Sequence, residues 1–403
     1  MGENDRAASR SPSPPRALPT AQPEVLGDDY LVEEETFSWY DPDNWYPVKI
    51  GDVFESRYQV LLKLGFGSVS TAWLCRDLRE HKYVTVKVYV TGHRQARTEY
   101  KVLQHIGSVS SDHPGRKLVR LALDSFELPG NKGPHVCIVH EPLGLSLAEL
   151  RDMFGGQIPP YILKGFAYRM LMALDFLHRE ARVVHTDIQP GNILFVLADA
   201  TVLDKAVEGE WEKPGLRKVD GDRVVYCSTE LGVPDDLGDP IICDFGDAQF
   251  GDPPFLGEVM PDLFRSPEIV LAIPWDRKID IWAFGLMIWH LLEGDTLFTE
   301  RLPSRDASTP AHLARMISLL GPPPPDLLEK GNVTANYFND DGTFKHPDLV
   351  SEATLEAEAK VLEGDDKAQF LDFIRRTLKW RPEDRPSAYQ LTNHPWLQEV
   401  FQK

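Results

Sequence analysis

Cysteines are scarce in this chain. The 403 residues include four of them, Cys75, Cys137, Cys227 and Cys243, and they are far apart with no Cys-x-x-Cys or Cys/His spacing. The pattern suggests neither a disulfide framework nor a zinc site. A reducing compartment fits best, so we expect the protein in the cytoplasm, the nucleus or both.

Long apolar runs are absent. No stretch approaches the roughly 20 apolar residues that span a bilayer. The nearest candidate, Ile279 to Leu292, is short and contains Asp280 and His290. We therefore interpret it as a buried core helix and expect no membrane association.

Positive charge is in deficit. The sequence has 43 Lys and Arg residues and 62 Asp and Glu residues, which gives a formal net charge of -19. This balance argues against duplex nucleic acid as the main partner and favours basic partners. From charge alone, an acidic surface that keeps the protein soluble is the simpler explanation.

The chain divides by composition. Residues 1–45 are rich in Pro, Ser and acids and are predicted to be disordered, because they bury too little apolar surface to offset chain entropy. From Tyr58, short β-prone runs predict an antiparallel sheet, interrupted by one helical stretch from His93 to Ile106. After Gly144 the pattern becomes helical.

These features predict an α+β fold with a small β lobe and a larger, mainly α lobe. We place the first lobe at residues 46–143 and the second at residues 144–403. A polar, net acidic stretch at residues 198–240 is interpreted as a surface insertion in the second lobe.

A glycine-rich stretch, LGFGSVSTA, runs from Leu64 to Ala72 between two predicted strands. Gly65 and Gly67 would let backbone N–H groups approach phosphates without interference from a Cβ atom. Alone the signal is weak, since a G-x-G turn is more often an ordinary hairpin.

A lysine follows inside the apolar strand VTVKVYV. Such a residue, here Lys87, usually lies at a sheet edge or extends its ammonium to solvent. Glu99, however, lies on the helix whose apolar face would cover the sheet. A Lys–Glu pair of this kind holds the α- and β-phosphates of a nucleotide, and the motifs that follow favour that interpretation.

Two further motifs carry carboxylates. VVHTDIQPGNILF supplies His185, Asp187 and Asn192, and ICDFGDAQF supplies Asp244. In phosphoryl transfer, Asp187 would orient the attacking hydroxyl and accept its proton, while Asn192 and Asp244 would bind Mg²⁺. Either motif alone can be an ordinary turn, but four motifs in one order argue against coincidence.

Downstream, Ser266-Pro267-Glu268 and WRPEDRPSA predict an ion pair between Glu268 and Arg385 that anchors the intervening segment. Together these motifs resemble the eukaryotic protein kinases from about Trp45 to Trp396. The resemblance is closest to the SR-protein kinases, which phosphorylate Ser in Arg/Ser-rich segments. It is carried by WYPVKIGDVFESRYQVLLKLGFG, HTDIQPGNIL and DIWAFGLMIWHLLEGDTLF, with HLARMISLLGPPP and YFNDDGTFKH typical of the wider group.

The resemblance implies a bilobal kinase fold with ATP and Mg²⁺ in the cleft. It implies catalytic roles for Lys87, Glu99 and Asp187, metal binding by Asn192 and Asp244, and His140 as gatekeeper. The implied nucleotide contacts are Leu64, Gly65, Phe66, Gly67, Ser68, Val69, Ser70, Thr71, Ala72, Lys87, Glu141, Leu143 and Leu194. It also implies basic Arg/Ser-rich protein substrates, for which an acidic protein is electrostatically suited, and we expect a monomer.

Several positions depart from the family pattern. Gln189 replaces the catalytic-loop Lys that steadies the γ-phosphate, and Pro261 replaces the Thr that normally bonds to that Lys. Loss of this charge should slow chemistry by ~10²-fold or more. Ala72 and Thr85 replace the Val and Ala that usually lie on either side of adenine. We therefore expect a lower affinity for the nucleotide than the family pattern implies.

Thr186 stands where an Arg usually receives an activating phosphate. The segment from Asp244 to Arg265 contains no Ser, Thr or Tyr, so it offers nothing to phosphorylate. We therefore expect this segment to be ordered by packing, with activity independent of phosphorylation there.

The leading hypothesis is an ATP- and Mg²⁺-dependent serine/threonine protein kinase of SR-protein kinase type. The alternative is a weakly active or inactive pseudokinase that acts as a binding scaffold, which Gln189 and Pro261 motivate. A small-molecule phosphotransferase is disfavoured by Glu268, Arg385 and the long helical insert.

Overall fold

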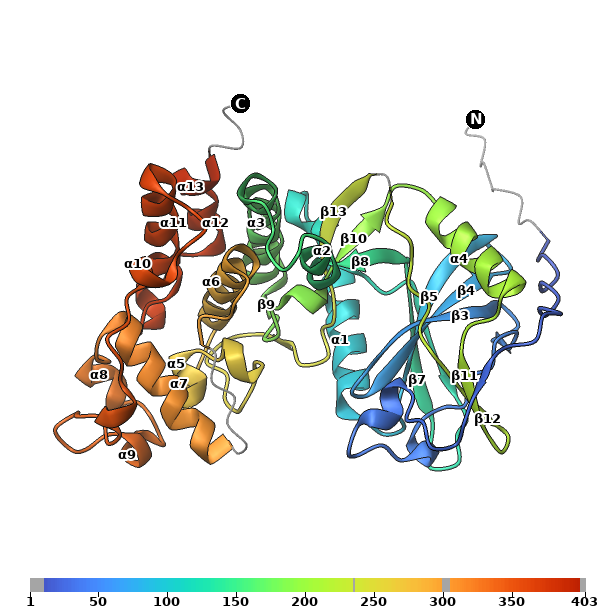
Figure 1. The fold of residues 1–403 in the computed structure, drawn as a ribbon, viewed down its shortest axis with the longest axis horizontal. Helices are drawn as coiled ribbons and strands as arrows, with labels where there is room; N and C mark the ends of the chain where they lie inside the picture. The colour runs from blue at the N-terminus through green and yellow to red at the C-terminus, as the bar shows by residue number, and fades with distance from the viewer. Residues whose placement is uncertain (1–10, 235, 299–304, 399–403) are drawn as a thin grey trace, which may run out of the picture. The chain divides into compact units, whose positions relative to one another are not determined.

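The structure, a computed structural model, describes residues 11–234, 236–298 and 305–398. The chain forms two compact units. Unit 1 comprises Met1–Tyr100, Leu121–Gly144 and Val196–Gly238, and unit 2 comprises Lys101–Arg120, Leu145–Phe195 and Asp239–Lys403. Figure 1 traces the chain through both. A β-sheet dominates unit 1 and helices dominate unit 2, which confirms the predicted α+β class.

Unit 1 is built on a six-stranded antiparallel sheet of order β2-β3-β4-β5-β7-β6. Its β-branched and aromatic residues suit a pleated sheet covered on both faces. One face carries a core that includes Val60, Val86 and Val139, and the other carries Leu61 and Leu74. The strands are β2 (Val53–Phe54), β3 (Tyr58–Gly67), β4 (Ser70–Asp77), β5 (Lys82–Tyr89), β6 (Asp124–Leu128) and β7 (His135–His140). Helix α1 (Arg94–Ser108) follows β5.

The acidic stretch after β10 also belongs to unit 1. It forms α4 (Thr201–Glu212), β11 (Arg217–Asp220) and β12 (Arg223–Tyr226). Helix α4 buries Leu203 and Val207 against Leu61 and Leu74 of the sheet, and Figure 1 shows it beside β4. The sequence predicts an insertion in the second lobe at residues 198–240, but residues 196–238 cluster with unit 1, where the apolar stripe of α4 packs on the sheet.

The N-terminal segment differs from the prediction of disorder through residue 45. Residues 11–45 are placed on unit 1 and include β1 (Val25–Leu26), η1 (Glu33–Thr36) and η2 (Pro42–Asn44). Strand β1 pairs in parallel with β11. Arg16 binds Glu208 of α4 at 2.9 Å and stacks on Trp211. Residues 1–10 lie outside the described part of the chain.

A buried lysine explains why this polar segment is ordered. Lys63 on β3 has no exposed side-chain surface, and its Nζ lies 2.8 Å from Glu33, 2.5 Å from Glu34 and 2.9 Å from the carbonyl oxygen of Tyr226. Burial raises the pKa of Glu34, and Lys63 opposes that rise. A buried ammonium is tolerated only when acceptors surround it, so Lys63 binds the N-terminal segment and β12 to the sheet.

Unit 2 is mainly helical. Its longer helices are α3 (Pro160–Asp175), α6 (Lys278–Glu293), α7 (Arg305–Leu320) and α11 (Gly364–Thr377). Aromatic side chains join two of them: Trp289 of α6 stacks on Phe370 of α11 at 5.7 Å, and Phe370 also contacts Trp396. The remaining helices are η3 (Pro114–Leu118), α2 (Leu147–Met153), η4 (Phe176–Ala181), η5 (Pro190–Asn192), η6 (Asp262–Phe264), α5 (Pro267–Val270), α8 (Pro325–Leu328), α9 (Thr334–Tyr337), η7 (Pro347–Leu349), α10 (Leu355–Glu358), η8 (Pro382–Asp384), α12 (Ala388–Thr392) and α13 (Pro395–Gln398).

Short strands complete the chain. Strand β9 (Val183–Val184) pairs with β14 (Gln249–Phe250) in unit 2. The chain passes from one unit to the other within α1, between Arg120 and Leu121, and within β8 (Leu143–Ser146), β10 (Ile193–Leu197) and β13 (Leu237–Ile242).

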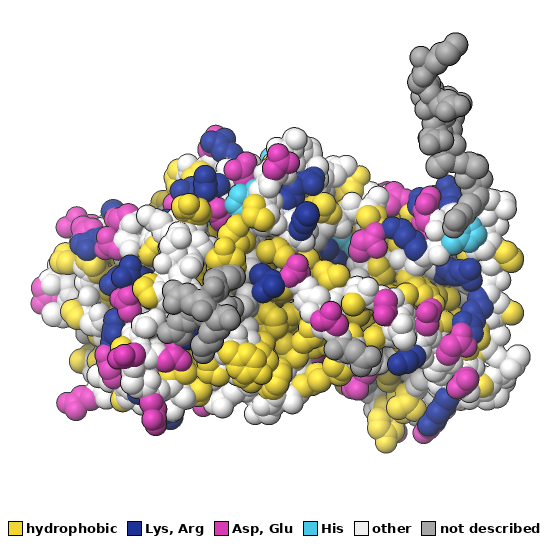
Figure 2. All heavy atoms as spheres, turned by 90° about the horizontal axis from the view of Figure 1, so that it is seen from above, with side chains coloured by type: hydrophobic (Ala, Val, Ile, Leu, Met, Phe, Trp, Pro, Cys, Tyr) yellow, Lys and Arg dark blue, Asp and Glu magenta, His cyan; other side chains and the backbone are white. Residues whose placement is uncertain are grey.

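Helix α6 confirms the predicted core helix, because every residue from Ile279 to Trp289 is buried. Asp280 is among them, with 1% of its surface exposed. No helix among the described residues has the length and apolar character needed to cross a membrane. On the face shown in Figure 2, acidic and basic side chains are interspersed.

Replacing Lys63 tests the anchor of the N-terminal segment. Lys63→Met should lower the free energy of unfolding by about 3–5 kcal/mol, because it leaves a buried carboxylate without its cation. Lys82→Met is the matched control: Lys82 also lies on a strand and pairs with Glu141, but its side chain is 43% exposed. Urea unfolding followed by circular dichroism measures both. Equal, small effects would contradict the assigned role of Lys63.

Candidate active site

The glycine-rich stretch forms the hairpin between β3 and β4. Gly67 pairs with Ser70, so Ser68 and Val69 make the turn. A Cβ atom built on Gly65 would meet no other atom within 4 Å. The backbone beside Gly65 therefore faces open space, which fits the close approach of phosphate oxygens.

Lys87 and Glu99 meet as the sequence predicted. Lys87 Nζ on β5 lies 2.9 Å from Glu99 Oε2 on α1, and the Tyr89 hydroxyl donates to the same oxygen. Glu99 is buried, whereas 15% of the Lys87 side chain is exposed. Ala72 is the cross-strand partner of Lys87. The carboxylate thus fixes a lysine on the strand next to the glycine-rich hairpin.

The residues expected around adenine follow on β5, β7 and the chain after β7. Thr85 pairs with His140 across these strands, and His140 Nδ1 lies 2.9 Å from the Leu121 carbonyl oxygen. The buried Thr85 hydroxyl has no hydrogen-bond partner among the described residues. The Glu141 side chain binds Lys82 at 2.7 Å, and Leu143 is buried. Leu194 lies on β10, in unit 2.

In unit 2, a buried carboxylate organises the loop that contains Asp187. Asp280 accepts hydrogen bonds from the backbone N–H groups of His185 and Thr186, each at 2.8 Å, and lies 2.8 Å from His178 Nε2. Thr186 has a φ of 70°, a left-handed conformation that costs energy in a β-branched residue. The bonds from Asp280, together with the bond that the Thr186 hydroxyl donates to the Asp247 carbonyl oxygen at 3.0 Å, hold the loop in this conformation.

Asp187 is held by two amide side chains. Gln189 Nε2 donates to Asp187 Oδ1 at 2.8 Å, and Asn192 Nδ2 donates to Asp187 Oδ2 at 2.6 Å. Burial raises the pKa of Asp187; His185 and the amide bonds oppose the rise, and Asp244 adds to it. The result is a fixed, partly desolvated carboxylate, suited to accept a proton from a hydroxyl.

Asn192 and Asp244 fit a magnesium site. The Asn192 amide nitrogen donates to the backbone and side-chain oxygens of Asp187, and these bonds fix the orientation of the amide and so of its oxygen. Asp244 has a φ of 63°, and one of its oxygens accepts from Gly246 N at 3.2 Å. One carboxylate and one amide oxygen are typical of Mg²⁺ sites that phosphate oxygens complete. Among the described residues, His, Cys, Asp and Glu form no group of three that would hold a metal alone.

The segment after Asp244 is ordered by packing, as the sequence predicted. Gln249 and Phe250 pair with β9. Further along, Phe255 and Trp275 exchange backbone hydrogen bonds, and Trp275 Nε1 donates to the Gly257 carbonyl. These contacts need no phosphate.

The predicted ion pair closes this segment. Arg385 NH2 lies 2.6 Å from Glu268 Oε2 and its NH1 lies 2.7 Å from Oε1, with both side chains fully buried. A bidentate pair of this kind specifies position strongly. It fixes α5 within unit 2.

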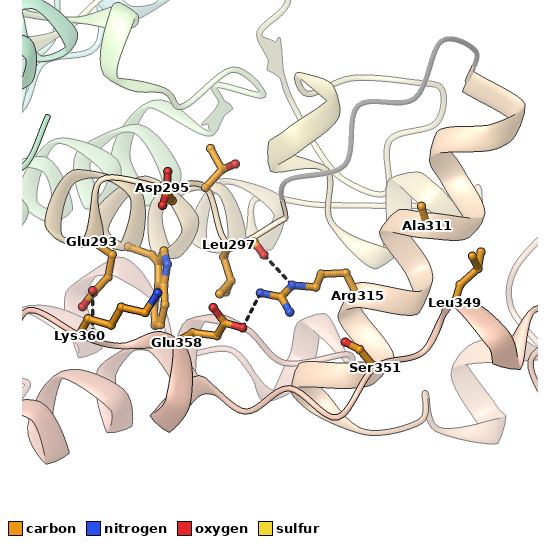
Figure 3. A pocket seen from close by; sticks show the side chains of 11 residues that line it. Glu293, Asp295, Leu297, Ala311, Arg315, Leu349, Ser351, Glu358 and Lys360 are labelled. Carbon is orange, nitrogen blue, oxygen red and sulfur yellow. Dashed lines mark hydrogen bonds and ion pairs between the residues drawn. The ribbon is translucent and has the colours of Figure 1, made fainter.

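Unit 2 also contains a pocket of about 340 Å³. Figure 3 shows Glu293, Asp295 and Glu358 around it, with Arg315 bound to Glu358 at 3.1 Å. Glu293 accepts from the Lys360 backbone at 2.8 Å. Asp295 is exposed, and its charge acts on the nearby His290.

Two features of this site were not predicted. Asp280 was noted only as a charge that argues against a membrane span; a lone acid in an otherwise apolar helix was the available signal. The bond from Gln189 to Asp187 had no sequence signal beyond the spacing of two residues.

Residues 58–231 and 232–397 match the model of the protein kinase domain. A serine/threonine protein kinase of Aspergillus fumigatus is 40% identical over 397 residues, 96% of both chains. Serine/threonine-protein kinase SRPK of Physarum polycephalum is 29% identical over 93% of both chains. SRSF protein kinase 3 of Sus scrofa is 24% identical over 96% of this chain and 94% of its own.

The matched domain covers most of the chain, and the most similar of these relatives exceeds 30% identity along nearly its whole length. With SRPK and SRSF protein kinase 3 among its relatives, the chain resembles the SR-protein kinases as the sequence predicted. The chain therefore belongs to the protein kinase family, among the serine/threonine protein kinases.

Proposed function

We propose that this protein transfers the γ-phosphoryl group of Mg-ATP to Ser in basic, Arg/Ser-rich protein segments. In unit 1, the glycine-rich hairpin and Lys87 would bind the phosphates. In unit 2, Asn192 and Asp244 would hold Mg²⁺, which supplies charge neutralisation when bound. Asp187 would orient the substrate hydroxyl and accept its proton.

The geometry of Asp187 carries the proposal. Its two oxygens accept from Gln189 and Asn192, so the carboxylate is preorganised. Asn192 is thereby oriented with its oxygen available to a metal. An inactive scaffold has no need for a partly desolvated carboxylate held in this way, which favours the enzyme over the pseudokinase.

Three observations support the choice of substrate. Relatives of this chain are named SRPK and SRSF protein kinase 3. The net charge of -19 attracts basic peptides. The pocket in unit 2 is lined by Glu293, Asp295 and Glu358 and also by Arg315 and Lys360 (Figure 3). Because Arg315 pairs with Glu358, the exposed Asp295 is the carboxylate that an arginine side chain would reach. A monomeric state, a cytoplasmic or nuclear location and the absence of duplex nucleic acid as a partner remain predictions from the sequence.

Replacing Asp187 tests the transfer reaction. Asp187→Asn should lower kcat for an Arg/Ser repeat peptide by about 10²- to 10⁴-fold, the usual worth of a positioned general base. Labelled ATP and Mg²⁺ with the full chain provide the assay, and ATP affinity measured by calorimetry provides the control. Equal, background incorporation by both proteins would refute the enzyme and leave the scaffold.

The pH dependence of kcat tests the role of Gln189. Because burial raises the pKa of Asp187 and the base must be ionised, kcat should fall as pH falls through that raised pKa. Gln189→Lys places a cation beside Asp187, so its pKa should fall and the acid limb should move to lower pH. Gln189→Met removes a hydrogen bond to the carboxylate, and its acid limb should move to higher pH. Identical profiles for all three proteins would contradict this account.

Neutralising Asp295 tests the pocket as a substrate site. Asp295→Asn should raise the KM for an Arg/Ser peptide about 3- to 10-fold at low salt, with kcat unchanged, because one attraction for arginine is lost. Asp340→Asn removes one exposed carboxylate elsewhere in unit 2 and should leave KM unchanged. If the two variants behave alike, the pocket does not bind the peptide.

A further inference from the structure

The N-terminal residues Glu33–Trp39, here called the strap, are fixed at one end by buried contacts within unit 1. Lys63, on the strand that leads into the glycine-rich hairpin, binds Glu33 at 2.8 Å and Glu34 at 2.5 Å. Lys63 is fully buried. The strap is therefore attached to the strand that carries the hairpin.

The insertion holds the same end of the strap. Lys218 of β11 binds Glu35 at 2.9 Å, and the Ser228 hydroxyl donates to Glu33 at 2.8 Å. Both interactions lie within unit 1. Two parts of the chain nearly two hundred residues apart thus fix the course of the strap.

The other end of the strap lies on the hairpin itself. The Phe37 ring stacks on the Trp39 ring at 5.0 Å and contacts the Phe66 ring at 5.9 Å. Trp39 Nε1 donates to the Ser68 carbonyl oxygen at 3.3 Å. Phe66 and Ser68 belong to the glycine-rich hairpin, and Ser68 forms its turn.

These aromatic contacts are not part of the hydrophobic core. Trp39 is 60% exposed and Phe66 is 42% exposed. Exposed aromatic residues that contact a glycine-rich turn restrict its motion at little benefit to global stability. A hairpin with Gly65 and Gly67 would otherwise lose more conformational entropy when a ligand orders it.

We propose that Phe37 and Trp39 are positioning residues for the glycine-rich hairpin and that they raise its affinity for nucleotide. The strap orders the hairpin before ligand arrives, so less entropy is lost on binding. The effect on affinity rests on the proposed use of ATP; the ordering of the hairpin does not.

Truncation of the two rings in the full chain tests the proposal. Phe37→Ala and Trp39→Ala should each raise the Kd for ATP and for ADP about 3- to 10-fold, since one ordered contact is worth roughly 1 kcal/mol. Calorimetry measures the Kd. Amide hydrogen exchange at residues 65–70 should be faster in both variants without nucleotide. The double variant should resemble either single variant, because the rings act as one stack.

Leu31→Ala is the matched control. Leu31 precedes the strap, is 66% exposed and should change neither the Kd nor the exchange. Unchanged Kd and exchange in both ring variants would overturn the proposal, as would equal changes in Leu31→Ala. If the unaltered protein binds no nucleotide, the proposed function fails, and the exchange rates still decide whether the strap orders the hairpin.

Discussion

The carboxylate of Asp280 accepts two backbone N–H groups in the interior of unit 2, and the geometry around Asp187 depends on it. These bonds keep Thr186 in a left-handed conformation that it would otherwise avoid. They thereby fix the backbone from which Asp187 projects. Only then can Gln189 and Asn192 hold the carboxylate from both sides.

Gln189 stands where the family has its catalytic-loop lysine. Gln189 keeps a hydrogen bond to Asp187 but brings no charge. A neutral donor preserves the position of the base and lowers its pKa less than a cation would. The substitution therefore separates two properties that a lysine combines: orientation of Asp187 is retained, and electrostatic support for the transferred phosphoryl group is lost.

Much of the architecture follows from local sequence patterns. The alternating strands of unit 1, the buried helix α6, and the pairs Lys87–Glu99 and Glu268–Arg385 were predicted because motif order and apolar periodicity specify them. The order of the segment after Asp244 was predicted because the segment has no Ser, Thr or Tyr whose phosphorylation could order it. In each case the residues on either side in the sequence form a motif, and the motif identifies the role of the side chain.

The N-terminal segment could not be predicted in this way. Its composition is typical of disorder, and its order comes from Lys63 and from an insertion far along the chain. A lysine within a β-strand is normally exposed, so no local pattern shows that Lys63 is buried among carboxylates. These contacts join residues that are far apart in the sequence. The residues themselves show no local pattern that predicts the contacts.

The central claim is that Asp187 belongs to a working phosphoryl-transfer centre. Its most direct test is a single turnover, with the full chain in excess over Mg-ATP and an Arg/Ser peptide in excess over both. Mass spectrometry and nucleotide chromatography would follow phosphoserine and ADP over time. We expect phosphoserine and ADP to form at the same rate and in equal amounts. Mg²⁺-dependent ATP binding with neither product would contradict it.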